Sequence, residues 1–171
     1  CRAISETRTR MQKHSPRSCL VAVEPPDQPD IQRLLALSDA VAARLYPGAF
    51  RQSLTAASLA LPSVTLFVAR EETTCALGCV ALVDLSDGTA ELKRMIVDPD
   101  HAGQGVGRTL LLALLQVARE RGIRTILLEV GIRNLEARRL YESAGFRNRG
   151  PFGTYRQTPI ATFMEMDLSG R

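Results

Sequence analysis

The chain of 171 residues is 45% hydrophobic and carries a formal net charge of +4, which fits one globular domain with a sizeable buried core. Its longest apolar run, residues 110–115, is far shorter than the roughly 20 residues that a membrane span needs, and its first residues lack the apolar core of a signal peptide. We therefore expect a soluble, cytoplasmic protein without membrane contact. The 4 cysteines have neither CxxC spacing nor the density of a disulfide scaffold, so we predict reduced, buried thiols and no metal site.

The excess positive charge lies at the start of the chain. Residues 1–17 hold five basic groups and one acidic group, so the remaining residues sum to zero. Because this segment is polar and aperiodic, we predict a flexible basic tail at 1–17, with Met11 as a candidate natural start, and a folded domain at 18–171. The confinement of the excess charge to the tail argues against nucleic-acid binding.

Within the domain, acidic and basic residues are unevenly divided. Residues 18–101 hold six basic and eleven acidic groups, whereas residues 102–149 hold nine arginines and four glutamates. This division could seat an anion on one side and a cation on the other. Two ordinary solvated faces explain the counts equally well.

The first half of the domain alternates strand and helix signals. We predict a strand at 19–24, an amphipathic helix at about 31–45 with Asp27 as its candidate cap, and a weaker helix at 53–60. Three further strands are predicted at 64–70, 76–85 and 89–97. The sequence "SDGT" between the last two predicts a hairpin.

The second half of the domain continues the alternation. We predict a helix at about 105–121 that Gly122 closes, a strand at 123–130, and a helix at 135–144 that Asn134 caps and Gly145 ends. A final strand is predicted at 158–168. The strands at 89–97 and 123–130 flank a crossover helix, so we expect them to be parallel and close together.

Three glycines stand within five residues in "DPDHAGQGVGRTLLLALL", residues 98–115, directly before a leucine-rich helix. A helix N-terminus leaves N–H donors unpaired and favours anions, and glycines let a phosphate approach the backbone closely. The first turn holds no acidic residue, and Arg108 adds positive charge. We therefore predict a phosphate-bearing ligand here, with a glycine-rich turn that binds nothing as the alternative.

The spacing of this loop fits two common nucleotide motifs poorly. A Walker loop would need glycine where Ala102 stands and lysine where Arg108 stands. The dinucleotide fingerprint GxGxxG would also need glycine at position 108.

The loop resembles the acyl-CoA pyrophosphate loop of the GNAT N-acetyltransferase superfamily, whose pattern is (Arg/Gln)-x-x-Gly-x-(Gly/Ala) after a strand that ends in "VDP". "AELKRMIVDPDHAGQGVGRTLL" is similar to the family's fourth strand, loop and third helix, and "NLEARRLYESAGF", residues 134–146, is similar to a second family segment. The resemblance covers about residues 19–168. One departure is Ala102, which stands at the position where the family usually has Arg or Gln.

The resemblance implies an α/β (α+β) fold: a GNAT-like single domain with a mixed central sheet of about six to seven strands and about four flanking helices. A splayed pair of parallel strands would bind acyl-CoA, with acetyl-CoA as the co-substrate. The pyrophosphate would rest on the loop, the pantetheine on the strand edge, and Asn134 would touch the pantetheine. The cofactor-binding residues implied in this way are Met95, Ile96, Val97, Gly103, Gln104, Gly105, Val106, Gly107, Arg108 and Asn134.

The resemblance also implies two proton carriers. Tyr141 would protonate the departing thiolate, and Glu91 would take the proton of the attacking amine, directly or through a water. The alternatives are a core-facing aromatic for Tyr141, a helix cap for Asn134, which it can be at the same time, and for Glu91 a salt bridge with Lys93 or Arg94. A backbone amide near Ile96 or Val97 would stabilise the oxyanion.

We therefore predict an acetyl-CoA-dependent N-acetyltransferase that acts on the primary amine of a small molecule in a ternary complex. The loops at 44–54 and 150–159 would build the acceptor pocket, and a homodimer is left open. A CoA-binding sensor or interaction module without turnover is the alternative, supported by Ala102 alone. A P-loop kinase is disfavoured because the Walker lysine is missing.

Overall fold

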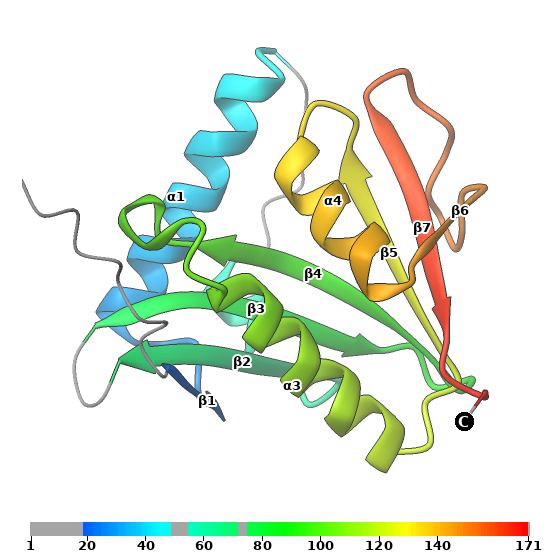
Figure 1. Ribbon diagram of the computed structural model, residues 1–171, viewed down its shortest axis with the longest axis horizontal. Coiled ribbons are helices and arrows are strands. Elements are labelled where there is room, and N and C mark those ends of the chain that lie inside the picture. Colours follow the sequence, from blue (N-terminus) through cyan, green and yellow to red (C-terminus); the bar gives the residue numbers. More distant parts are fainter. Residues whose placement is uncertain (1–18, 49–54, 72–74, 171) are drawn as a thin grey trace, which may run out of the picture.

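Seven strands form one sheet in the order β1-β2-β3-β4-β5-β7-β6 (Figure 1). The structure is a computed structural model that describes residues 19–48, 55–71 and 75–170. The strands are β1 (Cys19–Val23), β2 (Val64–Glu71), β3 (Ala76–Asp84), β4 (Thr89–Val97), β5 (Thr125–Gly131), β6 (Arg147–Arg149) and β7 (Ala161–Asp167). All neighbouring strands are antiparallel except β4 and β5, which are parallel as predicted.

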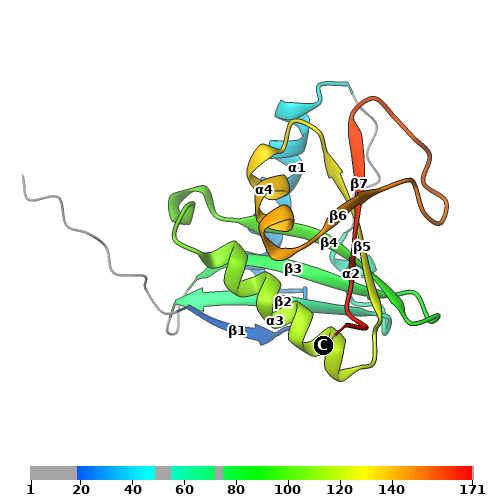
Figure 2. The ribbon, with the colours of Figure 1, turned by 45° about the vertical axis from the view of Figure 1, so that its right-hand side comes forward.

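Four α-helices and one short 3-10 helix cover the two faces of this sheet. They are α1 (Pro29–Leu45), α2 (Ala56–Leu59), η1 (Pro99–His101), α3 (Val106–Glu120) and α4 (Leu135–Ala144). Helices α3 and α4 cover one face, and α1 and α2 cover the other (Figure 2). The predicted mixed sheet and helix number are therefore confirmed. In the described part of the chain, no helix is long and apolar enough to cross a membrane.

Several predicted boundaries differ from the structure. Helix α1 begins at Pro29, two residues before the predicted start, because the φ of proline is fixed near the helical value. Its N-cap is therefore Gln28 and not Asp27. The strand β6 was not predicted, since its three polar residues show no periodicity and pair only through β7. The prediction of buried cysteines holds for Cys79, whereas Cys19 is partly exposed and Cys75 is exposed. The predicted tail at 1–17, with Cys1, and the first residues of the predicted helix at 53–60 lie outside the described residues.

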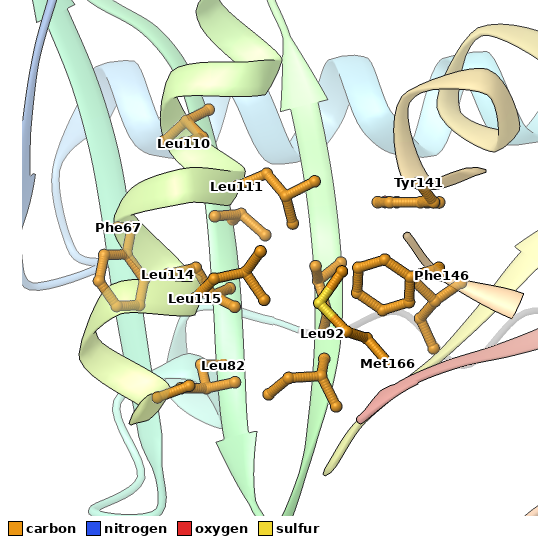
Figure 3. Close-up of a cluster of buried hydrophobic side chains, with 14 of the residues drawn as sticks. Phe67, Leu82, Leu92, Leu110, Leu111, Leu114, Leu115, Tyr141, Phe146 and Met166 are labelled. Atoms are coloured by element: carbon orange, nitrogen blue, oxygen red, sulfur yellow. The ribbon is translucent and has the colours of Figure 1, made fainter. Parts of the chain in front are cut away.

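The larger core lies between the sheet and α3. Leu110, Leu111, Leu114 and Leu115 are each no more than 3% exposed, whereas Leu112 on the opposite side of α3 is 54% exposed. Figure 3 shows these leucines facing the strands, with Tyr141 and Phe146 farther along the same layer. The helix is therefore held to the sheet by burial of one apolar stripe, which is worth about 1.5–3 kcal/mol per leucine.

The parallel strands β4 and β5 separate soon after they meet. They pair only over Thr89–Glu91, opposite Thr125–Leu127, and then diverge in both ribbon views. On its other side, β4 has a bulge, because Cys79 and Ala81 pair with Ile96 and Lys93 and leave two residues of β4 opposite one of β3. Arg94, in this bulge, has a φ of +57°. A bulge bends its strand, and this one lies in the part of β4 that is no longer paired with β5.

A charged cluster ties β1 and β2 to the start of α1. Arg70 of β2 donates hydrogen bonds to Glu24 at 2.7 and 2.8 Å and to Asp30 at 2.5 Å. Asp30 also accepts the amide of Ala76 at 3.0 Å. All three charged side chains are less than a quarter exposed, so the cluster is only partly screened by water.

Replacing Arg70 by Gln should lower stability at neutral pH and weaken its dependence on acid. Hydrogen bonds from Arg70 are the main cause that holds the pKa of Glu24 below its usual 4.5 and that of Asp30 below its usual 3.8. Such carboxyls contribute stability above their unfolded pKa and lose it as the pH falls through the folded pKa. We expect a loss of about 2 kcal/mol at neutral pH, measured by urea unfolding, that shrinks below about pH 4.

Arg149→Gln is the matched control for this prediction. Its partner Glu165 is 44% exposed, so the same change there should cost at most about 1 kcal/mol. Wild-type and Arg70→Gln stability curves that stay parallel between pH 7 and pH 3 would contradict the assignment.

Candidate active site

A cavity of about 590 Å³ occupies the space where β4 and β5 separate. Its walls come from β4, β5, α1, α2 and α4, with Tyr155 from the segment between β6 and β7. Five of the twelve predicted site residues line it: Glu91, Met95, Ile96, Asn134 and Tyr141. Val97 and the six loop residues 103–108 do not line it, and lie instead at the C-terminal end of β4 and beyond.

Glu91 stands in the cavity with two polar partners on one of its oxygens. Its Oε1 accepts the Tyr155 hydroxyl at 2.6 Å and lies 3.2 Å from Lys93 Nζ. Lys93 also donates to the Tyr155 hydroxyl at 2.7 Å. Glu91 is 6% exposed, and its neighbours therefore compensate the burial of its charge.

The contacts of Glu91 bear on both hypotheses for this residue. The expected salt bridge forms with Lys93, whereas Arg94 pairs with Asp39 of α1. The carboxylate nevertheless lines the cavity, and its Oε2 takes part in neither of these contacts. An ion pair and a proton-accepting role are compatible here, because they use different oxygens.

Tyr155 was not singled out from the sequence. Burial, followed by the hydrogen bond to Glu91, raises its pKa well above the usual value, so it stays a neutral donor. Phe152 and Phe163 pack against its ring with centroids 4.9 and 5.7 Å away. The loop at 150–159 is one of the two segments expected to build the acceptor pocket, but no periodicity within it marks this tyrosine.

Asn134 and Tyr141 reach the cavity from α4. Asn134 caps the helix, its Oδ1 accepting the amide of Ala137 at 3.3 Å, and it lines the cavity as well. Tyr141 is 4% exposed and packs on Phe146 with ring centroids 5.6 Å apart (Figure 3). Burial raises the pKa of its hydroxyl, so this group keeps its proton at neutral pH. Tyr141 is thus a core aromatic whose edge reaches the cavity.

The glycine loop leaves a row of amides free. Gly103 and Gly105 have φ values of +73° and +84°, and added Cβ atoms there would meet open space. Within the described residues, the amides from Gly103 to Arg108 have no hydrogen-bond acceptor, and the next amide, of Thr109, donates to Gly105 O at 3.0 Å. These donors lie at the positive end of α3, which is suited to an anion.

The glycine loop and the residues ahead of it are fixed by contacts with α4, β4 and α1. Gly107 approaches Leu140 of α4 and Val97 of β4, with 3.3 and 3.5 Å between an added Cβ and their side chains. Ahead of the loop, Asp98 caps η1 and receives a 2.7 Å ion pair from Arg33 of α1. Burial alone would raise the pKa of Asp98, but the hydrogen bonds from Arg33 and the Asp100 amide hold it below its usual value.

Tyr46 and Gly131, which line the cavity, form a close contact between the end of α1 and β5. Tyr46, just after α1, packs so closely on Gly131 that an added Cβ would lie 2.6 Å from its ring atoms. The Tyr46 hydroxyl accepts the amide of Arg133 at 2.6 Å, and the Arg133 guanidinium donates to Leu45 O at 2.9 Å. A glycine is therefore required at 131.

Comparison with known proteins places this geometry in a family. Residues 34–146 match the acetyltransferase (GNAT) family. An IAA acetyltransferase of Azospirillum brasilense is 37% identical over 149 residues, which is 86% of this chain and 97% of that protein. Among solved structures, one described as an acyl-CoA N-acyltransferase of Klebsiella pneumoniae has a TM-score of 0.77 and 32% identity, over 88% of this chain and 97% of its own.

A more distant structure shares the fold. It is a PaiA N-acetyltransferase of Thermoplasma acidophilum in complex with coenzyme A, with a TM-score of 0.66 and 17% identity over 86% of this chain and 99% of its own.

The contact between Lys93 and Glu91 predicts coupled effects on stability. Lys93→Met should cost about 2 kcal/mol in urea unfolding, because the carboxylate of Glu91 stays in the fold without its cation. Adding Glu91→Gln should cost less than the two single changes together, since it removes the uncompensated charge. Strict additivity of the two changes would show that the pair contributes nothing.

Proposed function

The chain belongs to the acetyltransferase (GNAT) family, and on that premise we propose that it transfers an acetyl group from acetyl-CoA to the primary amine of a small molecule, by direct attack in a ternary complex. The observation that carries this proposal is the fork between β4 and β5. It brings Glu91 and Tyr141 to one cavity and leaves the edge of β4 beyond Glu91 without a strand partner on that side.

The chain's own residues fit acetyl-CoA, which supplies the activated acyl group. Its pyrophosphate would take the free amides from Gly103 to Arg108 at the start of α3. Its pantetheine would pair with the edge of β4 at 95–97, where β5 has already diverged, and would meet Asn134. Ala102 offers no side-chain contact to phosphate, so in this proposal Arg108, which is exposed in the first turn, supplies the nearby positive charge.

Two side chains would then move protons in opposite directions. Glu91 would take the proton of the amine on Oε2, so that the nitrogen has a lone pair with which to attack. A backbone amide near Ile96 or Val97 would stabilise the negative charge that develops on the carbonyl oxygen. Tyr141, neutral because of its burial, would donate its proton to the departing thiolate.

The test of this function is thiol release from acetyl-CoA in the presence of a panel of small primary amines. Acceptor-dependent release, with acetylated product found by mass spectrometry, would support the proposal. Binding of CoA without thiol release across the panel would point to a CoA-binding module without turnover. Absence of CoA binding would overturn both.

Reversing the charge of Arg108 should separate CoA binding from folding. Arg108→Glu places a carboxylate beside the proposed pyrophosphate site, so we expect CoA affinity, measured by calorimetry, to fall about tenfold or more. The same acid at the first turn of α3 complements the helix dipole, so stability without ligand should not fall.

Arg119→Glu, in the last turn of the same helix, is the matched control. It makes the same charge change far from the loop and should leave CoA affinity nearly unchanged while lowering stability slightly. Equal loss of CoA affinity in both variants would mean that only net charge matters.

Tyr141→Phe should test the proposed acid. The change keeps the ring contact with Phe146 and removes the hydroxyl, so kcat should fall about 10²-fold with little change in CoA affinity. A Tyr141→Phe enzyme with wild-type kcat would leave Tyr141 as a packing residue.

Glu91→Gln should differ from Tyr141→Phe in its pH profile. Loss of the base should slow the reaction most at low pH, where few amines are already neutral, and less as the pH approaches the pKa of the amine. A wild-type rate at pH 7 would return Glu91 to a purely structural ion pair.

A further inference from the structure

The chain uses lysine very sparingly, and one of its lysines lies in the cavity. The sequence holds 20 arginines and only two lysines, Lys13 and Lys93. Lys93 is the only lysine among the residues that the structure describes, and it lines the cavity beside Glu91. A lysine ammonium is a compact point charge, whereas an arginine guanidinium is a broad planar fork, so the two are not interchangeable at a tight site.

Lys93 retains binding capacity toward the cavity. An ammonium has three N–H donors. One goes to the Tyr155 hydroxyl at 2.7 Å, and Glu91 Oε1, at 3.2 Å, takes at most one more. The side chain is 27% exposed, so at least one donor is left for a ligand.

Glu91 has the complementary capacity. Tyr155 and Lys93 both contact its Oε1, so Oε2 can still accept a hydrogen bond from a ligand. Tyr155 holds this arrangement in place, because it donates to Glu91 and accepts from Lys93 at the same time. An acceptor of hydrogen bonds and a donor of hydrogen bonds, of opposite charge, therefore stand side by side on β4.

We propose that Glu91 and Lys93 form an acceptor subsite for a zwitterion, a small molecule that carries a carboxylate next to its primary amine, as α-amino acids do. The amine would meet Glu91 Oε2 and the carboxylate would meet the remaining donor of Lys93. This inference rests on the proposed acetyl transfer and names the substrate class for it.

Charge complementarity favours a zwitterion over a plain amine. A plain alkylammonium at Glu91 would stand close to the ammonium of Lys93 and would be repelled by it. A carboxylate on the neighbouring carbon turns that repulsion into an ion pair in a partly buried place, where such contacts are stronger than at the surface. The second cation of the cavity, Arg94, already pairs with Asp39 of α1.

The experiment compares matched acceptors on the wild-type chain. Alanine, leucine and phenylalanine are each tested against their amides and against the amines that lack the carboxyl group, with thiol release as the readout and the pH adjusted so that each acceptor is equally deprotonated. We expect kcat/KM to be about tenfold or more higher for at least one acid than for its amide and its amine.

Two variants assign the preference to Lys93. In Lys93→Met the ratio of kcat/KM between acid and amide should fall toward one, whatever the absolute rates are. Arg149→Met, which removes a cation paired with Glu165 outside the cavity, should keep the wild-type ratio. If Lys93→Met does not bind CoA, we take it to be unfolded. Lys93→Gln, which keeps a polar end to the side chain, is then used in its place.

The outcomes separate this inference from the function on which it rests. Amides and plain amines that react as well as the acids overturn the zwitterion subsite and leave acetyl transfer to amines standing. An acid preference that survives in Lys93→Met and Lys93→Gln overturns the role of Lys93. No turnover with these acceptors, in a chain that acetylates other amines of the panel, overturns the zwitterion subsite alone. No turnover with these acceptors or with any amine of the panel, while CoA binds, overturns the proposed function and the subsite together.

Discussion

The early separation of β4 from β5 is the constraint on which the rest of the structure depends. Two parallel strands that stayed paired would satisfy each other's backbone groups and leave no room between them. Here they pair over three residues each, and a bulge at Arg94 bends the part of β4 that follows. The gap between the two strands contains the cavity and leaves one edge of β4 without a strand partner. Both features follow from the course of the backbone.

Helix α1 holds this open fork in shape by polar contacts at several points along its length. Arg33 pairs with Asp98 ahead of the glycine loop, Asp39 pairs with Arg94 in the bulge, and Leu45 O accepts from Arg133 after β5. These two ion pairs and one hydrogen bond connect α1 to the residues before the glycine loop, to the bulge of β4 and to the residues after β5. Because each one joins α1 to a different part of the site, the helix relates the proposed CoA side to the proposed acceptor side.

Of the charged side chains in the cavity, one pair is engaged in holding elements together and another can still bind a ligand. Arg94 and Asp39 neutralise each other across two elements, whereas Lys93 and Glu91 stand two residues apart on one strand and meet through the same carboxylate oxygen. Successive side chains of a strand alternate between faces, so residues 91 and 93 share one face. The Tyr155 hydroxyl bonds to both side chains and so fixes their orientation. Lys93 then offers a donor, and Glu91 an acceptor, to a ligand in the cavity.

The sequence by itself determined all elements but β6 and the short helix η1, together with their order along the chain, because apolar periodicity and glycine or asparagine caps are local signals. The strand β4 and the helix α4 have their predicted bounds, and Gly122 and Gly145 end their helices with φ values of +72° and +104°. It also placed Glu91, Tyr141 and the glycine loop as candidates, since their spacing matches a family pattern. Only the tertiary structure decided which partners these residues have. Tyr155 lies 64 positions from Glu91 in the chain, and Arg33 lies 65 positions from Asp98. Contacts over such separations arise when the sheet and helices pack together, and no local pattern in the sequence encodes them.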